Sequence, residues 1–520
     1  MFSMIVTYTG VGFLLYLAAL LSYRLLLHPL RSYRGPLLAK LTDGYAGAHA
    51  LAWRLHLITY RDHRKHGPVM RHGPNRLVFN TVTAYRDIYK NEKITKSDVY
   101  RATQQSKNAF SILNVRDRAL HRLKRKLIGR AVSEQSMRSF EPTMTREVDV
   151  FLHKLLDASR STGPKRIVNM AQNLKYLGYD VVGHLAFGYP LRLQTDAENR
   201  FIAKANAYGN YRINVYMQWP LLRYFKIELL FDRIASSLRA RLLSLIEKMI
   251  TTRLSQATDA TRDLYYHVAD EFGTGASDVR LGNLWSEAVF FIPAGGDTTS
   301  TALSALFFYL SHNPTCYHRL VEEIRTTFRQ GADICGRPQL FSCQYLRACI
   351  DEALRLSPPL PGTLWRELAE DSDEPWVIDG HIIPPGTKVG VNIYSLHHND
   401  EYFPEPFAFV PERWLEAETP YPQVSNKIMQ DAFAAFLTGP RGCAGKAMAY
   451  LEASLVMART LWYFDFELAP GQPGKAGPSG AGNGRERGRD AEYQLYDVFI
   501  SIHDGPNLVF KTRGDVDEVL

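Results

Sequence analysis

One cysteine lies in a pattern of residue types that is able to do chemistry. Residues 436–445 read FLTGPRGCAG and match the pattern F-x-x-G-x-R-x-C-x-G at all five fixed positions. A chance match in a chain of this length has a probability on the order of 10⁻⁴. A helical pattern begins directly after Cys443, so the backbone N–H groups of a helix N-terminus can stabilise a negatively charged sulfur there.

The residues that flank Cys443 suit a flat iron cofactor. Gly439 and Gly445 allow the backbone to approach the sulfur and a ring closely. Arg441 can pair with a haem propionate, and Phe436 can shield the ligand from water. The alternative is a buried structural cysteine ahead of a helix, which leaves the four flanking matches unexplained. The pattern therefore predicts that Cys443 is the axial thiolate ligand of haem b (iron protoporphyrin IX), a ligand that favours O–O bond cleavage.

A second motif, AGGDTT at residues 294–299, lies inside the apolar stretch 288–310. The glycine pair and the preceding Pro293 are expected to loosen the helix and to make room for a bound dioxygen. Asp297 and Thr298 supply an acid and a hydroxyl that can relay protons. The alternative is a face of small residues that serves only helix packing.

Two charged residues lie one turn apart on an otherwise apolar helix. They are Glu352 and Arg355, and buried charges of this kind must be paired. Arg413, in the segment PERW at residues 411–414, is the candidate for a third member of an ion triad. The sequence predicts a structural role for this triad, not a chemical one.

These motifs together resemble the cytochrome P-450 superfamily of haem-thiolate monooxygenases, and the resemblance covers nearly the whole chain. The sequence is most similar to fungal microsomal members, which often act in secondary-metabolite biosynthesis. The resemblance implies a mainly α fold with small β-sheets (α+β), preceded by one transmembrane helix. It also places the triad of Glu352, Arg355 and Arg413 behind the haem.

The resemblance extends to further contacts with the cofactor and the substrate. His121, Arg125 and Arg366 stand where the family places haem-propionate partners, although the family often has tryptophan in place of His121. The alternative for each is a solvated surface cation. Expected substrate contacts are Ala294, Phe110 (with residues up to 113), Leu364 (with residues from 360) and the aromatic-rich segment 208–219. Those aromatic residues could equally belong to the core or to a membrane interface.

The implied reaction inserts one oxygen atom from O₂ into an apolar small molecule. Electrons would come from NADPH through an NADPH-cytochrome reductase, with cytochrome b5 as a second candidate donor. Outward-pointing basic residues of segment 116–130 could dock an acidic flavoprotein, or they could form an ordinary charged helix face.

Two other functions remain open. One is a haem-thiolate isomerase or dehydratase that acts on a peroxide without a reductase. Enzymes of that kind tend to lose the acid–threonine pair, which this chain keeps as Asp297 and Thr298. The other is a non-catalytic haem or membrane-scaffold protein.

The N-terminus has the length and composition of a membrane anchor. Residues 1–23 carry no charged side chain, and about 20 apolar residues span a bilayer. The first basic residue, Arg24, is followed by others, which places the C-terminal side in the cytosol. A cleaved signal peptide would need a basic start and a small-residue cleavage site. We therefore expect a single-pass anchor in the endoplasmic reticulum membrane over residues 1–27 and a proline-containing hinge over 28–44.

Residues 45–520 are expected to form one catalytic domain. Helical periodicity occurs near 116–130, 143–157, 232–256, 285–311, 314–329, 343–356 and 444–461, and strand-like patterns at 77–79, 377–391 and 496–500. Residues 471–488 are rich in Gly, Pro and Arg and are predicted to be a disordered loop insertion between C-terminal strands.

Composition narrows the range of partners. The 520 residues carry a net charge of +9, which suits a nucleic acid, an anionic membrane or an acidic protein. The chain has neither zinc-finger spacing nor a long basic tail, so we expect no nucleic-acid partner. The five cysteines include no C-x-x-C pair, which argues against a disulfide framework and predicts a reducing compartment for the catalytic part.

Overall fold

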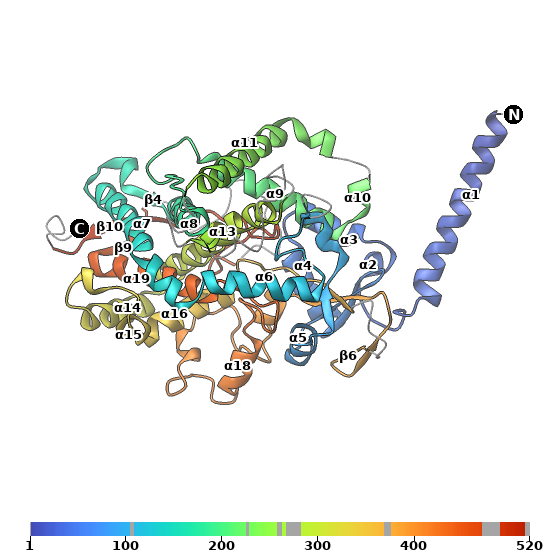
Figure 1. Ribbon diagram of the computed structural model, residues 1–520. Coiled ribbons are helices and arrows are strands. Elements are labelled where there is room, and N and C mark those ends of the chain that lie inside the picture. The colour runs from blue at the N-terminus through green and yellow to red at the C-terminus, as the bar shows by residue number, and fades with distance from the viewer. Residues whose placement is uncertain are drawn as a thin grey trace.

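The computed structural model describes residues 2–104, 109–224, 228–256, 263–266, 282–368, 376–470 and 489–514. Within these ranges helices dominate and the strands form small sheets, which confirms the expected mainly α fold (Figure 1). The predicted loop insertion at residues 471–488 lies outside the described residues.

The described helices include one at each predicted periodicity and further ones, such as that at residues 170–187, that no periodicity predicted. Their bounds are α1 (Phe2–Ser22), α2 (Leu37–Leu41), α3 (Gly44–Leu51), α4 (Leu55–His66), α5 (Val82–Tyr89), α6 (Arg118–Ala131), α7 (Glu134–Arg160), α8 (Met170–Phe187), α9 (Phe201–Gln218), α10 (Leu221–Tyr224), α11 (Glu228–Leu254), α13 (Asn283–His312), α14 (Pro314–Thr327), α15 (Pro338–Phe341), α16 (Gln344–Leu356), α17 (Ile393–His397), α18 (Asn426–Ala432) and α19 (Lys446–Tyr463).

The strands of the described residues form three sheets. Their bounds are β1 (Val69–Gly73), β2 (Arg76–Phe79), β3 (Ile94–Lys96), β4 (Ile167–Asn169), β5 (Arg366–Leu368), β6 (Trp376–Ile378), β7 (His381–Ile383), β8 (Lys388–Val391), β9 (Phe464–Leu468) and β10 (Asn507–Thr512). The largest sheet has the order β1-β2-β8-β5-β3, in which β2 and β8 are parallel and Leu77 lies opposite Val389. The others are β4-β10-β9 and β6-β7.

One predicted strand is wrong. Residues 496–500 form bends and a single bridge from Tyr496 to Ile502, and the C-terminal strand begins only at Asn507. Phe499 has a φ of +85°, which is incompatible with an extended strand. The alternation of apolar and polar residues therefore reflects a folded-back loop in which Tyr496, Val498 and Ile500 are all buried.

The N-terminal helix stands apart from the body of the protein (Figure 1). The apolar stretch Met4–Leu27 is long enough to cross a membrane and none of it is buried, which confirms a helix that could act as an anchor. The link that follows is held against the body of the protein. Arg71, fully buried in β1, donates to the carbonyl oxygens of Arg24 (2.8 Å) and Pro74 (2.8 Å), and His28 contacts Asn75 (2.7 Å).

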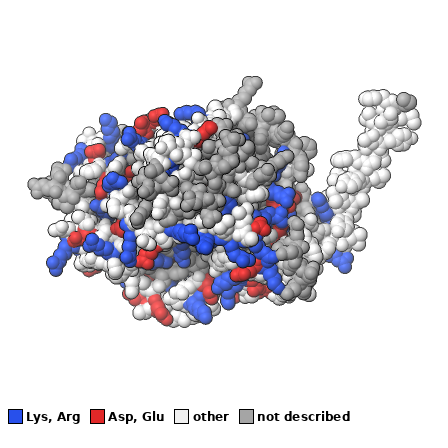
Figure 2. All heavy atoms as spheres, in the orientation of Figure 1, with Lys and Arg blue, Asp and Glu red and all other residues white. Residues whose placement is uncertain are grey.

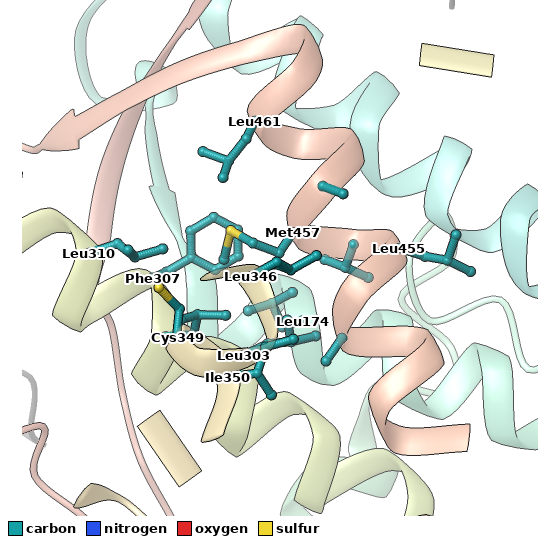
Figure 3. Close-up of a cluster of buried hydrophobic side chains, with 14 of the residues drawn as sticks. Leu174, Leu303, Phe307, Leu310, Leu346, Cys349, Ile350, Leu455, Met457 and Leu461 are labelled. Carbon is teal, nitrogen blue, oxygen red and sulfur yellow. The ribbon is translucent and has the colours of Figure 1, made fainter. Parts of the chain in front are cut away.

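The main hydrophobic core lies where α13 meets α16 and α19 (Figure 3). Leu303, Phe307 and Leu310 share one face of α13 and are at most 1% exposed. They meet a buried stripe of α16 that includes Leu346 and Ile350. Full burial of each such side chain stabilises the fold by about 1.5–3 kcal/mol, so this core fixes α13 relative to the helix that follows Cys443.

Glycines bring α13 into close contact with α8. A Cβ atom at Gly296 would lie 2.7 Å from the Tyr179 ring, and one at Gly295 would lie 2.8 Å from Val182. A Cβ atom at Gly178 would in turn lie 2.8 Å from the carbonyl oxygen of Gly296. The helix continues through Pro293 without a break. The glycine pair thus serves helix packing, and a loosening of α13 that makes room for dioxygen stays a prediction.

The predicted ion triad is present and fully buried. Both oxygens of Glu352 accept from Arg355, at 2.9 and 2.8 Å, and Arg413 donates to Glu352 at 3.0 Å. The Trp414 indole and the Val410 backbone N–H complete the ligation of the carboxylate, at 3.0 and 3.1 Å. The triad therefore joins α16 to the segment at residues 410–414.

Replacing Glu352 with leucine should strongly destabilise the protein. Two buried guanidinium groups lose their only carboxylate partner in the triad, and breaking a buried ion pair costs about 3–5 kcal/mol. Thermal unfolding measures the loss. Glu134→Leu is the control, because its pair with Arg138 is exposed and should contribute less than about 1 kcal/mol. Equal stability of the two variants would contradict a structural role for the triad.

Candidate active site around Cys443

A tight loop presents Cys443. The Cys443 N–H donates to the Phe436 carbonyl at 2.8 Å, and the Gly442 N–H donates to the Gly439 carbonyl at 3.0 Å. Gly439 has a φ of +74°, and a Cβ atom there would collide with the Tyr89 carbonyl oxygen. Glycine is therefore required at this position by backbone conformation and by close packing against α5.

Burial opposes ionisation of the Cys443 thiol, whereas three nearby groups favour it. The Cys443 side chain is exposed, yet the surrounding protein desolvates it enough to raise the pKa of the thiol. The Gly445 N–H, Arg125 and Lys446 act in the opposite direction. A coordinated metal ion deprotonates a thiol outright, and these three groups would then stabilise the thiolate. Gly445 is the N-cap of α19, so the predicted helix start beside the cysteine is confirmed.

Phe436 lies beside the loop as expected. Its ring centroid is 5.0 Å from that of Tyr450, and the Lys446 ammonium lies 5.7 Å from its ring. A Cβ atom at Gly445 would meet no protein atom within 4 Å, so the protein's own packing does not explain the glycine there. Close approach of a cofactor to Gly445 remains a prediction.

Basic side chains from three parts of the chain line a single cleft. The lining includes Arg118, His121, Arg122, Arg366 and Arg441, together with the acidic Glu92. Burial, then Arg441 and its basic neighbours, lower the pKa of His121 to about 3. Burial, then Arg366, lower the pKa of Arg441 to about 10. The predicted group of His121, Arg366 and Arg441 is thus brought together.

The charge of this cleft fits a dianionic ligand. Arg366 and the nearby Lys96 are buried, and neither they nor Arg441 forms an ion pair with a carboxylate of the described residues. Their partners are neutral, such as the carbonyl oxygen of Trp365 for Arg366 (3.1 Å). Buried charges normally need opposite charge. A haem would supply it through two propionates, while Cys443 would supply the axial thiolate.

Two arginines make contacts that the sequence did not predict. Arg125 projects from α6 to the thiolate loop, where it donates to the carbonyls of Gly442 (2.6 Å) and Cys443 (3.3 Å) instead of lining the cleft. Arg441 does line the cleft, and it also donates to the carbonyls of Val115 (2.7 Å) and Arg116 (2.9 Å). Both therefore hold backbone segments around the candidate haem site.

The acid and the hydroxyl of α13 point in different directions. The Thr298 hydroxyl donates to the Ala294 carbonyl at 2.6 Å, and both residues lie away from α8. Asp297 is 5% exposed, and its carboxylate lies 3.7 Å from the Lys175 ammonium of α8. Burial raises the pKa of Asp297, whereas Lys175 and the Tyr179 hydroxyl lower it. The structure therefore links Asp297 to α8 and leaves Thr298 on a different face.

The expected substrate segments have mixed outcomes. Phe110 and Leu364 are half-buried, and the Leu364 carbonyl accepts from Tyr89 (2.8 Å). Three aromatic residues of segment 208–219 lie at the surface or against other parts of the chain: Tyr208 is 50% exposed, Tyr211 packs against Trp53, and Trp219 packs against Gly47 of α3. Their contact with a substrate stays a prediction. The buried side of α9 carries four amides, Asn206, Asn210, Asn214 and Gln218, beside the apolar residues Ile202, Ala205, Val215 and Met217.

Sequence reasoning missed several buried charged residues. Lys96 lies in a short strand without any motif, and Lys175 lies on a helix that the periodicities did not include. Glu452 is the one acidic residue of α19, and burial raises the pKa of its carboxyl to about 8. A lone acid on an otherwise apolar helix is a signal that could have identified Glu452.

Comparison with known proteins agrees with this geometry. The cytochrome P450 family model matches residues 49–481. The chain is 34% identical to the cytochrome P450 monooxygenase poxM of Penicillium oxalicum, over 96% of this chain and 93% of that protein. It is 35% identical to apf7 of Gibberella fujikuroi, over 94% and 95%, and 33% identical to atnE of Emericella nidulans, over 94% and 93%, both also named cytochrome P450 monooxygenases.

The chain belongs to the cytochrome P450 family. It is an oxidoreductase of the monooxygenase class, and the family's haem is its cofactor.

Replacing Arg366 with leucine should weaken haem retention. A hydrogen bond to a charged group contributes about 1.5–3 kcal/mol, which corresponds to about a tenfold to hundredfold faster loss of haem. Transfer of haem to apomyoglobin measures the rate. Lys126→Leu, an exposed cation on α6, is the control and should lose haem at the rate of the unaltered protein. An unchanged rate in Arg366→Leu would show that the cleft does not bind propionate.

Proposed function

We propose that this protein inserts one oxygen atom from O₂ into an apolar small molecule in fungal secondary-metabolite biosynthesis, using NADPH electrons delivered by a reductase. The observation that carries the proposal is the combination of the Cys443 loop with the buried basic cleft, on one fold with the Asp297–Thr298 pair. Family membership supports the reaction class.

Haem, when bound, would supply the oxidation: with two electrons and two protons, one oxygen atom of O₂ would enter the substrate and the other would leave as water. The protein's residues set the conditions. Arg125 and the Gly445 N–H stabilise the negative charge of Cys443, and Phe436 limits access of water. The propionates would be held by Arg366, Arg441, His121 and Arg125. The triad of Glu352, Arg355 and Arg413 would keep the fold behind the cofactor rigid.

Proton supply is assigned to α13. The raised pKa of Asp297 favours a carboxyl that can hold a proton, and Lys175, whose side chain is 14% exposed, connects it toward solvent. The Thr298 hydroxyl donates to the Ala294 carbonyl oxygen, and it can rotate to donate instead into the space over the cofactor. Ala294 lies one turn away and limits the size of what fits there, with Phe110 and Leu364 as further substrate contacts.

A basic face beside the thiolate loop suits an acidic reductase. Arg122, Lys126 and Arg130 are exposed and lie on one side of α6, where Figure 2 shows a run of basic side chains. The same helix supplies Arg125 to the Cys443 loop. Electrostatic steering would bring an NADPH-cytochrome reductase, or cytochrome b5, to the side of the molecule from which electrons must enter.

The cellular setting follows from the N-terminus. Residues 1–27 would anchor the protein in the endoplasmic reticulum membrane, residues 28–44 would form the hinge, and residues 45–520 would form one cytosolic domain. Apolar substrates concentrate in such a membrane. The fungal relatives support a role in secondary metabolism.

Replacing Thr298 with valine should uncouple the reaction. The substitution keeps the shape of the side chain and removes the hydroxyl, so product formed per NADPH should fall by about tenfold to a hundredfold while hydrogen peroxide increases. The full-length protein is assayed in membranes with a fungal NADPH-cytochrome reductase. The substrate is the apolar compound that gives the largest Soret shift in a binding screen.

Thr460→Val is the matched control, because Thr460 makes the same hydroxyl bond to a carbonyl four residues earlier, at 2.6 Å, far along α19. It should leave the coupling unchanged. Turnover of a peroxide substrate without NADPH or reductase would contradict the proposal and favour an isomerase or dehydratase. Equal coupling in both valine variants would remove Thr298 from proton delivery.

A further inference from the structure

Side chains, not a strand or a helix, hold the segment at residues 111–116. The Lys96 ammonium donates to the carbonyls of Ile112 (3.0 Å) and Leu113 (2.6 Å). Arg441, from the cysteine loop, donates to the carbonyls of Val115 and Arg116, at 2.7 and 2.9 Å. Backbone carbonyls that regular structure would satisfy here accept from Lys96, which is buried, and from Arg441, which is half-buried. The segment is therefore tied to β3 and to the thiolate loop.

One carboxylate holds the same segment from the other side. Both oxygens of Glu287 accept from the Ile112 N–H, at 2.9 and 3.0 Å, and the Lys124 ammonium donates to Glu287 at 3.0 Å. Glu287 and Lys124 are at most 1% exposed. The contact joins three pieces of chain that are distant in sequence: the segment, α6 and the first turns of α13.

The position of Glu287 on α13 relates this contact to the chemistry. Ala294 and Thr298 lie seven and eleven residues after Glu287, so all three residues lie on one face of the helix. Glu287 is about 10 Å along the helix axis from Ala294. A segment held by Glu287 is therefore placed at the end of the helix face that carries the proposed proton donor and the proposed substrate contact.

We propose that Glu287 is a positioning residue for substrate selection: through the Ile112 N–H it fixes the segment at residues 110–113 over the distal side of the haem and so sets the size of ligand that the site accepts. This inference rests on the proposed function. Lys124 balances the buried charge of Glu287, and Lys96 holds the carbonyl side of the same residue, Ile112.

Stability alone does not account for this arrangement. A buried ion pair is often no more stabilising than apolar residues of the same volume. The Glu287 carboxylate of this pair, however, also accepts from the Ile112 N–H, which belongs to an irregular segment. An apolar replacement would provide no acceptor for that N–H. Its specific effect is the location of Ile112.

Two double variants isolate that effect. Lys124→Met with Glu287→Leu removes both charges and the acceptor, so no orphan charge is buried. Lys124→Met with Glu287→Gln removes both charges but keeps an oxygen that accepts from Ile112. Glu323→Gln is a control on α14, because the Glu323 carboxylate also accepts from backbone N–H groups, those of Tyr345 (2.9 Å) and Leu346 (2.8 Å).

The haem-loaded proteins are compared by hydrogen exchange at residues 110–113 and by spectral titration with a compact azole, 4-phenylimidazole, and a bulky one, clotrimazole. The leucine double variant should exchange the Ile112 amide about 10–100-fold faster and should shift the ratio of the two azole dissociation constants by about tenfold toward the bulky ligand. The glutamine double variant and Glu323→Gln should stay within about threefold of the unaltered protein.

The outcomes separate this inference from the proposed function. The carbon monoxide spectrum of each variant reports whether the haem site is intact. An intact spectrum with unchanged exchange and an unchanged azole ratio in the leucine variant overturns the role of Glu287 and leaves the proposed function standing. Equal behaviour of the leucine and glutamine variants also overturns it, because the acceptor would then be irrelevant. Failure of the unaltered protein to bind haem would instead defeat the proposed function.

Discussion

Arg441, Arg366 and Lys96 bring positive charge into the interior of the protein, and the neutral groups that they contact cannot cancel that charge. Burial and then these cations lower the pKa of His121 to about 3. Such a cluster is stable when an anionic group completes it. The two propionates of haem meet that need, so cofactor binding and folding of this region are coupled.

The same cations organise the backbone around the site. Arg441 connects the loop of Cys443 to the segment at residues 111–116, and Arg125 connects that loop to α6. Glu287 continues the connection to α13. The Cys443 loop, the basic cleft and α13 are thereby fixed to one another through side chains. The charges of these side chains are either paired or would be paired by the cofactor. The buried core between α13 and α19 provides the rigid support behind them.

Local patterns predicted the elements and residues whose function depends on sequence neighbours. The Cys443 loop, the helix after it and the pair Glu352–Arg355 follow from spacing alone, and the structure confirms their placement. Contacts between distant segments were not predictable in this way. Arg125 was expected to contact propionate, but its contact with the Cys443 carbonyl depends on how α6 crosses the loop. Lys96 and Glu287 have no motif, because their partners are backbone groups of a segment far away in the chain.

The glycines of α13 illustrate the same limit. A glycine pair before an acid and a threonine fits a loosened helix and a close helix–helix contact equally well. Only the structure shows the helix–helix contact. The side chains of Tyr179 and Val182 lie 2.7 and 2.8 Å from the points that Cβ atoms on Gly296 and Gly295 would occupy. Likewise, aromatic residues on α9 suggested a roof over the substrate, but sequence alone did not show that Tyr211 packs against Trp53 or that four amides lie on the buried side of that helix. Composition identifies which residues are able to act, and the packing of neighbouring helices decides which of them do.

The central claim is that Cys443 is the thiolate ligand of a haem. The most direct test is the carbon monoxide difference spectrum of the reduced, haem-loaded protein beside that of Cys443→Ala. The account predicts the red-shifted Soret band of a thiolate-ligated haem in the unaltered protein and its loss in the variant. Absence of that band from the unaltered protein, or its persistence in Cys443→Ala, would contradict the account.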